Sequence, residues 1–266
     1  MPSQLYIKWI DGDYQPTSFD NLDNKAFWCS KTEVKEEAFA KIVKKIREIR
    51  KIKKMEEFPW DIEVHPNKKK DPFHPDLICN CGNGDQIGEV KIKNSPLFFA
   101  KKWYEIEPQY ALTMDLKDSF NYRRWLDRGI DIQIFIWVKW EAHRLKTWVN
   151  DPNKCNYYNV LPLKGIWTTK FSTLLDFERK NSPPIHWYKE QFRKPKIFNI
   201  NSIEGQEALA FDRRLQISDY EVKGVTSNGF MNSNGVIYPA GHSSGSYVFD
   251  LSNKDLFEDL GSKLGY

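Results

Sequence analysis

The chain has 266 residues, of which 40% are hydrophobic and 15% aromatic. This length and composition predict a substantial packed core, in one large domain or a core with an appendage, and exclude wholesale disorder. No run approaches the roughly 20 apolar residues of a membrane span, and the first residues lack the apolar core of a signal peptide, so we expect a cytoplasmic protein without membrane contact.

The formal net charge is only +4, but the positive charge is concentrated in two places. Residues 31–54 hold ten Lys or Arg against four Glu, and a second basic cluster consists of Lys68, Lys69 and Lys70. Such clusters bind the phosphates of a nucleic acid by releasing its counterions. A basic helix face in contact with water explains residues 31–54 equally well.

The first clear element is a helix over residues 32–55, where apolar residues recur every three or four positions between Lys, Arg and Glu. Three short strands are expected next, because β-prone runs follow one another and a Gly-rich turn between the last two is typical of a hairpin. These strands cover residues 60–65, 75–81 and 86–92.

A second helix is expected over residues 115–128, because Gly129 provides a stop signal directly after it. Residues 130–138 form a nearly continuous apolar run, which is typical of a central strand covered on both faces. One more strand is expected over residues 165–177. The order helix, three strands, helix, strand predicts an α/β fold with a mixed β-sheet flanked by helices (an αβββαβ core).

The composition changes near residue 194, after which Asn, Ser and Gly alternate with short β-prone pieces. We therefore expect a main domain over residues 1–194, with its core at about 32–138. Residues 195–266 would form a β-rich C-terminal extension or small accessory domain.

Two acids and a lysine meet on the predicted hairpin. Period-two alternation puts Glu89 and Lys91 on one face of their strand, and the hairpin brings Asp76 within cross-strand reach of Glu89. Two carboxylates so close repel each other unless a cation lies between them, and ligation by oxygen suits Mg²⁺. An ammonium beside such a metal holds a phosphate oxygen, orients a water or stabilises developing negative charge.

The cysteines nearest to these acids are expected to be packed thiols. Cys79 and Cys81 alternate with Asp76 along the predicted strand, so they face away from it. The site is therefore predicted to be built from carboxylates and not from thiolates.

Pro75-Asp76 followed by Glu89-Val90-Lys91 resembles the signature of the PD-(D/E)XK nuclease superfamily. That group includes type II restriction enzymes, Holliday-junction resolvases and phage exonucleases. Its common core has the order helix, three strands, helix, strand, which is the order predicted here for residues 32–138. The resemblance covers that core, for which it implies a restriction-endonuclease-like fold, and says nothing about the rest of the chain.

The resemblance also implies roles for these residues. Asp76 and Glu89 would bind Mg²⁺, for which Mn²⁺ can substitute, and the backbone carbonyl of Val90 would be a further ligand. Lys91 would position or activate the attacking water.

Many members of the superfamily add an acid from the first helix. Here Glu37 is preferred slightly over Glu33 and Glu36. A solvated acid paired with Lys41 one turn later explains Glu37 at least as well.

Together these features predict a Mg²⁺-dependent endonuclease that hydrolyses phosphodiester bonds in DNA, in the first place of the restriction type. By resemblance, its products would carry a 5′-phosphate and a 3′-hydroxyl, and cleavage of both strands would favour a homodimer. The residues expected to contact the substrate backbone are Lys68, Lys69, Lys70 and Lys93. The alternatives are a structure-selective (Holliday-junction-type) or RNA-directed nuclease on the same core, and a catalytically inactive nucleic-acid-binding protein.

Overall fold

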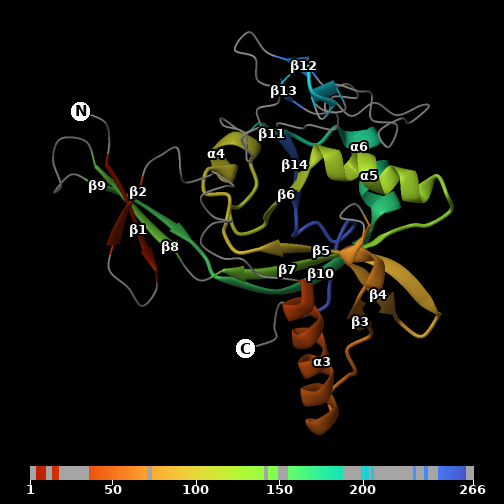
Figure 1. Cartoon of the computed structure of the whole chain (residues 1–266). Helices are drawn as coiled ribbons and strands as arrows, with labels where there is room; N and C mark the ends of the chain where they lie inside the picture. The colour runs from red at the N-terminus through yellow and green to blue at the C-terminus, as the bar shows by residue number, and fades with distance from the viewer. Residues whose placement is uncertain are drawn as a thin grey trace.

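The chain has a mixed α/β architecture in which helices flank a central sheet (Figure 1). The structure is a computed structural model. It describes residues 4–9, 14–17, 36–70, 74–140, 143–148, 155–187, 199, 201–203, 205–206, 230–231, 237–238 and 245–261.

Six strands form the central sheet in the order β15-β10-β7-β5-β4-β3. Strands β5 and β7 are parallel, and the other neighbouring pairs are antiparallel. Strands β3, β4 and β5 follow one another as the predicted three strands, with the predicted hairpin between β4 and β5. The bounds are β3 Asp61–Val64, β4 Leu77–Asn80, β5 Asp85–Lys93, β7 Gln133–Trp140, β10 Leu163–Lys170 and β15 Glu258–Asp259.

Helices cover both faces of this sheet, with α3 on one side and α5 and α6 on the other (Figure 1). Successive residues of β7 pack into different hydrophobic cores on the two faces of the sheet. Phe135 packs with Phe39 of α3, whereas Ile134 packs with Phe171 of α6. The expectation of a central strand buried on both faces is therefore confirmed. The helix bounds are α3 Glu36–Ile52, α5 Leu116–Leu126 and α6 Phe171–Asn181.

Smaller sheets and helices complete the described structure. A three-stranded sheet has the order β11-β14-β6, a four-stranded sheet has the order β2-β1-β8-β9, and β12 pairs with β13. The strand bounds are β1 Gln4–Trp9, β2 Tyr14–Thr17, β6 Ala111–Asp115, β8 His143–Trp148, β9 Cys155–Val160, β11 Ile185–Trp187, β12 Phe230–Met231, β13 Ile237–Tyr238 and β14 Gly245–Asp250. The short helices are α4 Ala100–Tyr104 and the 3₁₀ helix η1 Pro66–Lys69.

The strand expected over residues 165–177 is wrong in its second half. Strand β10 ends at Lys170, and helix α6 begins at the next residue. The buried residues of this segment recur at helical spacing, and they are Phe171, Leu174, Leu175 and Glu178. Strand β10 itself is buried at every position from 165 to 169, and helical spacing begins where the chain turns to cover the sheet face.

Among the described residues, strands from either side of residue 194 pair with each other. Strand β14 pairs with β6, and β15 adds to the edge of the central sheet beside β10. Strand β14 and the residues around β15 complete the buried cores. The residues that do so are Val248, Phe249, Leu251, Leu256, Phe257 and Leu260. Residues 245–261 thus belong to the same folded unit as residues 36–187.

The helix and strand order expected for the core is present as α3, β3, β4, β5, α5 and β7, with α4 and β6 inserted before α5. None of the described helices combines the length and the apolar character needed to cross a membrane. The start expected for the first helix, residues 32–35, and with it Glu33, lies outside the described residues.

Candidate functional site

The candidate site lies where β4 begins and β5 continues alone beside β7. Pairing between β4 and β5 ends at Leu77 and Gly88, whereas β5 remains paired with β7 as far as Lys93. Asp76 and Glu89 are the next residues beyond the last β4–β5 pair. The end of this pairing therefore brings the two predicted acids face to face.

Asp76 and Glu89 interlock through backbone hydrogen bonds. The Asp76 N–H donates to Glu89 Oε2 at 3.3 Å, and the Val90 N–H donates to Asp76 Oδ2 at 3.3 Å. Because the N–H and C=O of one strand residue point to the same neighbour, the Val90 carbonyl faces the Asp76 side as well. The proximity predicted from the hairpin is confirmed, and both acids are buried, Asp76 being 4% and Glu89 8% exposed.

Two ammonium groups lie against this acid pair. Lys68 Nζ is 2.6 Å from Asp76 Oδ1, and Lys91 Nζ is 3.0 Å from Glu89 Oε1. Lys91 Nζ also contacts Asp118 Oδ2 at 2.7 Å. Three carboxylates against two ammonium groups leave a formal charge of −1 on the cluster.

One face of helix α5 covers the cluster. Asp118, Tyr122 and Trp125 follow at i, i+4 and i+7, so they share a face of the helix. Asp118 holds Lys91, and the Tyr122 hydroxyl donates to Glu89 Oε1 at 2.7 Å. The ring of Trp125 meets that of His74 edge to face, with the centroids 5.0 Å apart.

Sequence reasoning missed Asp118 and Tyr122. Their i, i+4 spacing in a predicted helix was visible in the sequence. Which helix face lies over Glu89, however, depends on how α5 crosses the sheet, and no local pattern encodes that.

The surroundings of Lys91 keep it charged. Burial acts to lower the pKa of Lys91, but the charges of Asp118 and Glu89 and the hydrogen bond to Asp118 outweigh it, so the pKa is well above its ordinary value. Burial, followed by Asp118 and Glu89, raises the pKa of Tyr122 well above its ordinary value. Lys91 is therefore a fixed positive charge and Tyr122 a neutral hydrogen-bond donor.

The donors present fit a magnesium-like ion. Asp76 and Glu89 offer two carboxylates and Val90 a carbonyl, and Mg²⁺ accepts such a small oxygen set together with several waters. The ammonium groups of Lys68 and Lys91 stand in for a cation at the two carboxylates. Within the described ranges, no group of three or more His, Cys, Asp or Glu side chains has metal-binding geometry.

Helix α3 does not bring its acids to this cluster among the described contacts. Val90 points into the core under α3, whereas Glu89 and Lys91 lie on the α5 face of the sheet. Glu37 is exposed in the groove between α3 and β3. The additional acid that reaches Lys91 is therefore Asp118 from the second helix.

The predicted substrate-binding lysines occupy three different environments. Lys69 and Lys70 are exposed, as a phosphate contact requires. Lys68 is engaged with Asp76. The ammonium of Lys93 donates to the Thr113 carbonyl at 2.5 Å and to its hydroxyl at 2.6 Å, so two of its three N–H groups are already engaged.

Cys79 on β4 lies as expected, whereas Cys81 follows the strand, is only partly buried and lines the pocket beside the hairpin turn. Cys79 is fully buried on the α3 side, together with Leu77 and Val90. Burial raises the pKa of the Cys79 thiol to about 12. Such a thiol is a packing group and not a ligand of the candidate site.

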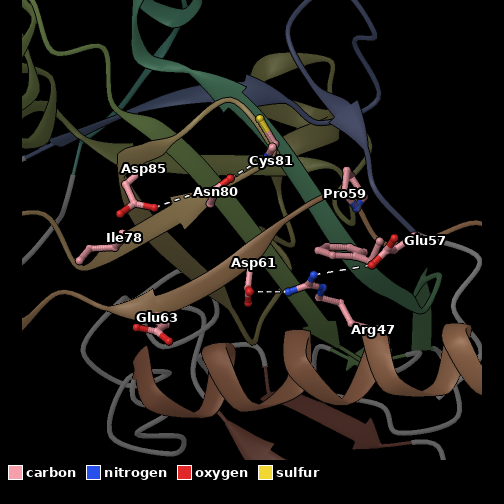
Figure 2. A pocket seen from close by; sticks show the side chains of 11 residues that line it. Arg47, Glu57, Pro59, Asp61, Glu63, Ile78, Asn80, Cys81 and Asp85 are labelled. Carbon is pink, nitrogen blue, oxygen red and sulfur yellow. Dashed lines mark hydrogen bonds and ion pairs between the residues drawn. The ribbon is translucent and has the colours of Figure 1, made fainter.

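A pocket of about 590 Å³ lies at the opposite end of the hairpin, beside the turn that joins β4 to β5 (Figure 2). Arg47 crosses it to bind Asp61 at 2.6 Å and Glu57 at 3.6 Å. Neither Asp76 nor Glu89 lines this pocket. The pocket is therefore separate from the cluster of Asp76, Glu89 and Lys91.

No family model matches the chain, and searches of curated proteins and solved structures found no significant match. The functional argument therefore depends on the geometry of the Asp76, Glu89 and Lys91 cluster.

Proposed function

We propose that this chain is a Mg²⁺-dependent nuclease that hydrolyses phosphodiester bonds in DNA, on a restriction-endonuclease-like core. The observation that carries the proposal is the interlocked pair of Asp76 and Glu89 with Lys91 bound beside it. The order α3, β3, β4, β5, α5, β7 supports it, because it agrees with the order implied by the resemblance to the PD-(D/E)XK superfamily.

In this proposal Asp76, Glu89 and the Val90 carbonyl hold the metal. Mg²⁺ held there would supply Lewis-acid chemistry at a phosphoryl oxygen and lower the pKa of a water. Lys91 offsets the negative charge that develops on the phosphate, and Asp118 keeps its ammonium in place. Because the carboxylates of Glu89 and Asp118 both bind its ammonium, we assign Lys91 the role of a cation beside the phosphate.

The proposed substrate is DNA, which Lys69, Lys70 and the basic side chains of α3 would hold through the phosphates. A restriction-type enzyme with one such site per chain would cut both strands as a homodimer.

The test is cleavage of plasmid DNA in Mg²⁺ and in EDTA. We expect Glu89→Gln and Lys91→Met each to lower the cleavage rate by about 10²-fold or more, because each removes a group that offsets transition-state charge or holds the metal. Asp176→Asn and Lys180→Met, exposed on the far part of α6, make the same charge changes and should cut normally. Undiminished cutting by either site variant would exclude the assignment.

The same assay distinguishes the alternative substrates. Linear duplex, a four-way junction and RNA are compared with the wild-type chain, and preferential cutting of a junction or of RNA would replace the restriction-type proposal.

A further inference from the structure

Lys68 lies in η1, a short 3₁₀ helix held firmly to the start of β4. The His65 N–H donates to the Asp76 carbonyl at 2.8 Å, and the Asn67 N–H is capped by His65 Nδ1 at 3.0 Å. The rings of His65 and His74 lie with their centroids 3.9 Å apart. These contacts fix the backbone around Lys68, so a departure of its ammonium from Asp76 would have to come from the side chain.

The ammonium of Lys68 covers the carboxylate that the metal would use. It is 2.6 Å from Asp76 Oδ1 and donates to the His74 carbonyl at 2.9 Å. The Lys68 side chain is 26% exposed and that of Asp76 only 6%. Lys68 therefore lies between solvent and this carboxylate oxygen.

The charge of the cluster favours replacement of Lys68 by a divalent ion over the presence of both at Asp76. With both lysines in place the cluster has a formal charge of −1, and adding a divalent ion would make it +1. Exchanging Lys68 for a divalent ion instead makes the cluster neutral. Two cations at contact distance from one buried carboxylate oxygen repel each other strongly, because little solvent screens them.

We propose that Lys68 is a built-in counter-ion that neutralises Asp76 in the metal-free protein, must be displaced when the metal binds, and so sets the metal affinity of the site. This inference rests on the metal site of the proposed function, but not on the chemistry that the site performs. Lys68 is then a positioning residue whose contact with Asp76 weakens metal binding.

The experiment is a calorimetric titration of the metal-free, full-length protein with Mn²⁺. Lys68→Met removes the charge and keeps most of the side-chain length. Lys68→Arg keeps the charge. Lys180→Met is the matched control, because this exposed lysine on α6 undergoes the same change of charge and has no part in the site.

We expect Lys68→Met to bind Mn²⁺ about tenfold more tightly than wild type. The metal then no longer has to break the Lys68–Asp76 ion pair, which we expect to weaken binding by about that factor. Lys68→Arg and Lys180→Met should stay within about twofold of wild type. Equal affinities for Lys68→Met and wild type would overturn the inference. So would equal tightening by Lys180→Met, or no Mn²⁺ binding by any of the proteins.

Melting temperatures in EDTA and in Mn²⁺ give a second comparison, and they serve even if Lys68→Met is only marginally stable. In EDTA this variant should melt below wild type, because it leaves the buried Asp76 charge without Lys68. Addition of Mn²⁺ should raise its melting temperature more than that of wild type, and an equal or smaller rise would contradict the proposal.

The outcomes separate this inference from the proposed function. If Lys68→Met binds Mn²⁺ more tightly but no variant cleaves DNA, the counter-ion role of Lys68 stands and the proposed nuclease activity is rejected. If cleavage depends on Glu89 but Lys68→Met and wild type bind Mn²⁺ equally, the nuclease activity stands and the counter-ion role of Lys68 is rejected.

Discussion

At the scale of single residues, the protein keeps a buried lysine charged by surrounding it with acids. Lys91 contacts both Glu89 and Asp118, and its ammonium lies 5.3 Å from the centre of the Tyr122 ring. Burial by itself would favour the neutral amine. The charge of Lys91 therefore depends on its partners, and chiefly on Asp118.

Asp118→Asn should destabilise the protein by about 1–2 kcal/mol near pH 8, because the buried charge of Lys91 then has only the carboxylate of Glu89 to balance it. The folded-state pKa of Lys91 is raised above the value of about 10.4 expected in the unfolded chain. The stability that this shift provides is fully present below about pH 10 and is lost as the pH rises through the folded pKa.

Urea unfolding of wild type and Asp118→Asn at pH 8 and at pH 10.5 measures both effects. The variant should lose less stability than wild type between these two pH values, since the pKa of its Lys91 is raised less. The raised pKa of Tyr122 also costs stability above about pH 10, and Asp118 contributes to it, so the smaller loss expected of the variant reports Lys91 and Tyr122 together. Parallel losses in both proteins would contradict the role given to Asp118.

The thiol of Cys79 should resist alkylation in the folded protein. With a pKa of about 12, it is ionised in about one molecule in ten thousand at pH 8, and the thiolate is the reactive form. Peptide mapping after iodoacetamide treatment at pH 8 should find Cys81, which is partly exposed, modified before Cys79. Rapid labelling of Cys79 without denaturant would show that β4 opens readily.

At the scale of elements, the site depends on how closely β4, β5 and β7 approach one another. A Cβ atom on Gly88 would lie 3.1 Å from Cys79 Sγ, 3.3 Å from Leu77 Cβ and 3.4 Å from the Gln133 carbonyl oxygen. Gly88 directly precedes Glu89. Its missing side chain lets the three strands pack and places the carboxylate at the end of the hairpin pairing.

Gly88→Ala should cost about 1–3 kcal/mol of unfolding free energy, because the new methyl group overfills this contact. Cys79→Ala removes the nearest atom, so the double variant should cost less than the sum of the two single changes. The measurement is a double-mutant cycle in urea.

Gly84→Ala is the matched control for this cycle. It strains a residue with φ +93°, but its Cβ would meet no atom within 4 Å. Its cost should therefore add to that of Cys79→Ala. Simple additivity at Gly88 as well would mean that the contact with Cys79 does not limit this position.

At the scale of the whole molecule, the C-terminal segment closes the core that the earlier elements begin. Strand β14 lies between β11 and β6, and Phe249, Leu251 and Phe257 pack in the same cluster as β7 and α6. Removing them would leave β6 and β11 without the strand between them and expose apolar surface on the sheet face that carries the site.

A chain ending at residue 194 should therefore fail to form the native core, and Phe249→Ala in the full chain should cost about 3–5 kcal/mol. Circular dichroism and thermal unfolding of the two proteins against wild type provide the measurement. Cooperative melting of the 1–194 chain near the wild-type temperature would instead support the separate extension expected from composition.

The elements that local patterns specify were predicted from the sequence. The hairpin of β4 and β5, the amphipathic α3 and the apolar run of β7 each have a turn, a period or a composition that favours one local conformation. The pairing of Asp76 with Glu89 follows from the hairpin by counting residues. For the same reason, alternation placed Cys79 on the face opposite these acids.

The remaining features depend on contacts between distant parts of the chain. The position of Asp118 and Tyr122 over Glu89 requires α5 to cross the sheet with one particular face down, and β14 joins β6 across more than a hundred residues. The sequence by itself determined which acids and which lysine share a hairpin. Only the tertiary structure decided that Lys68 covers Asp76 and that Asp118 holds Lys91, because side chains from separate elements compete for the same buried carboxylates.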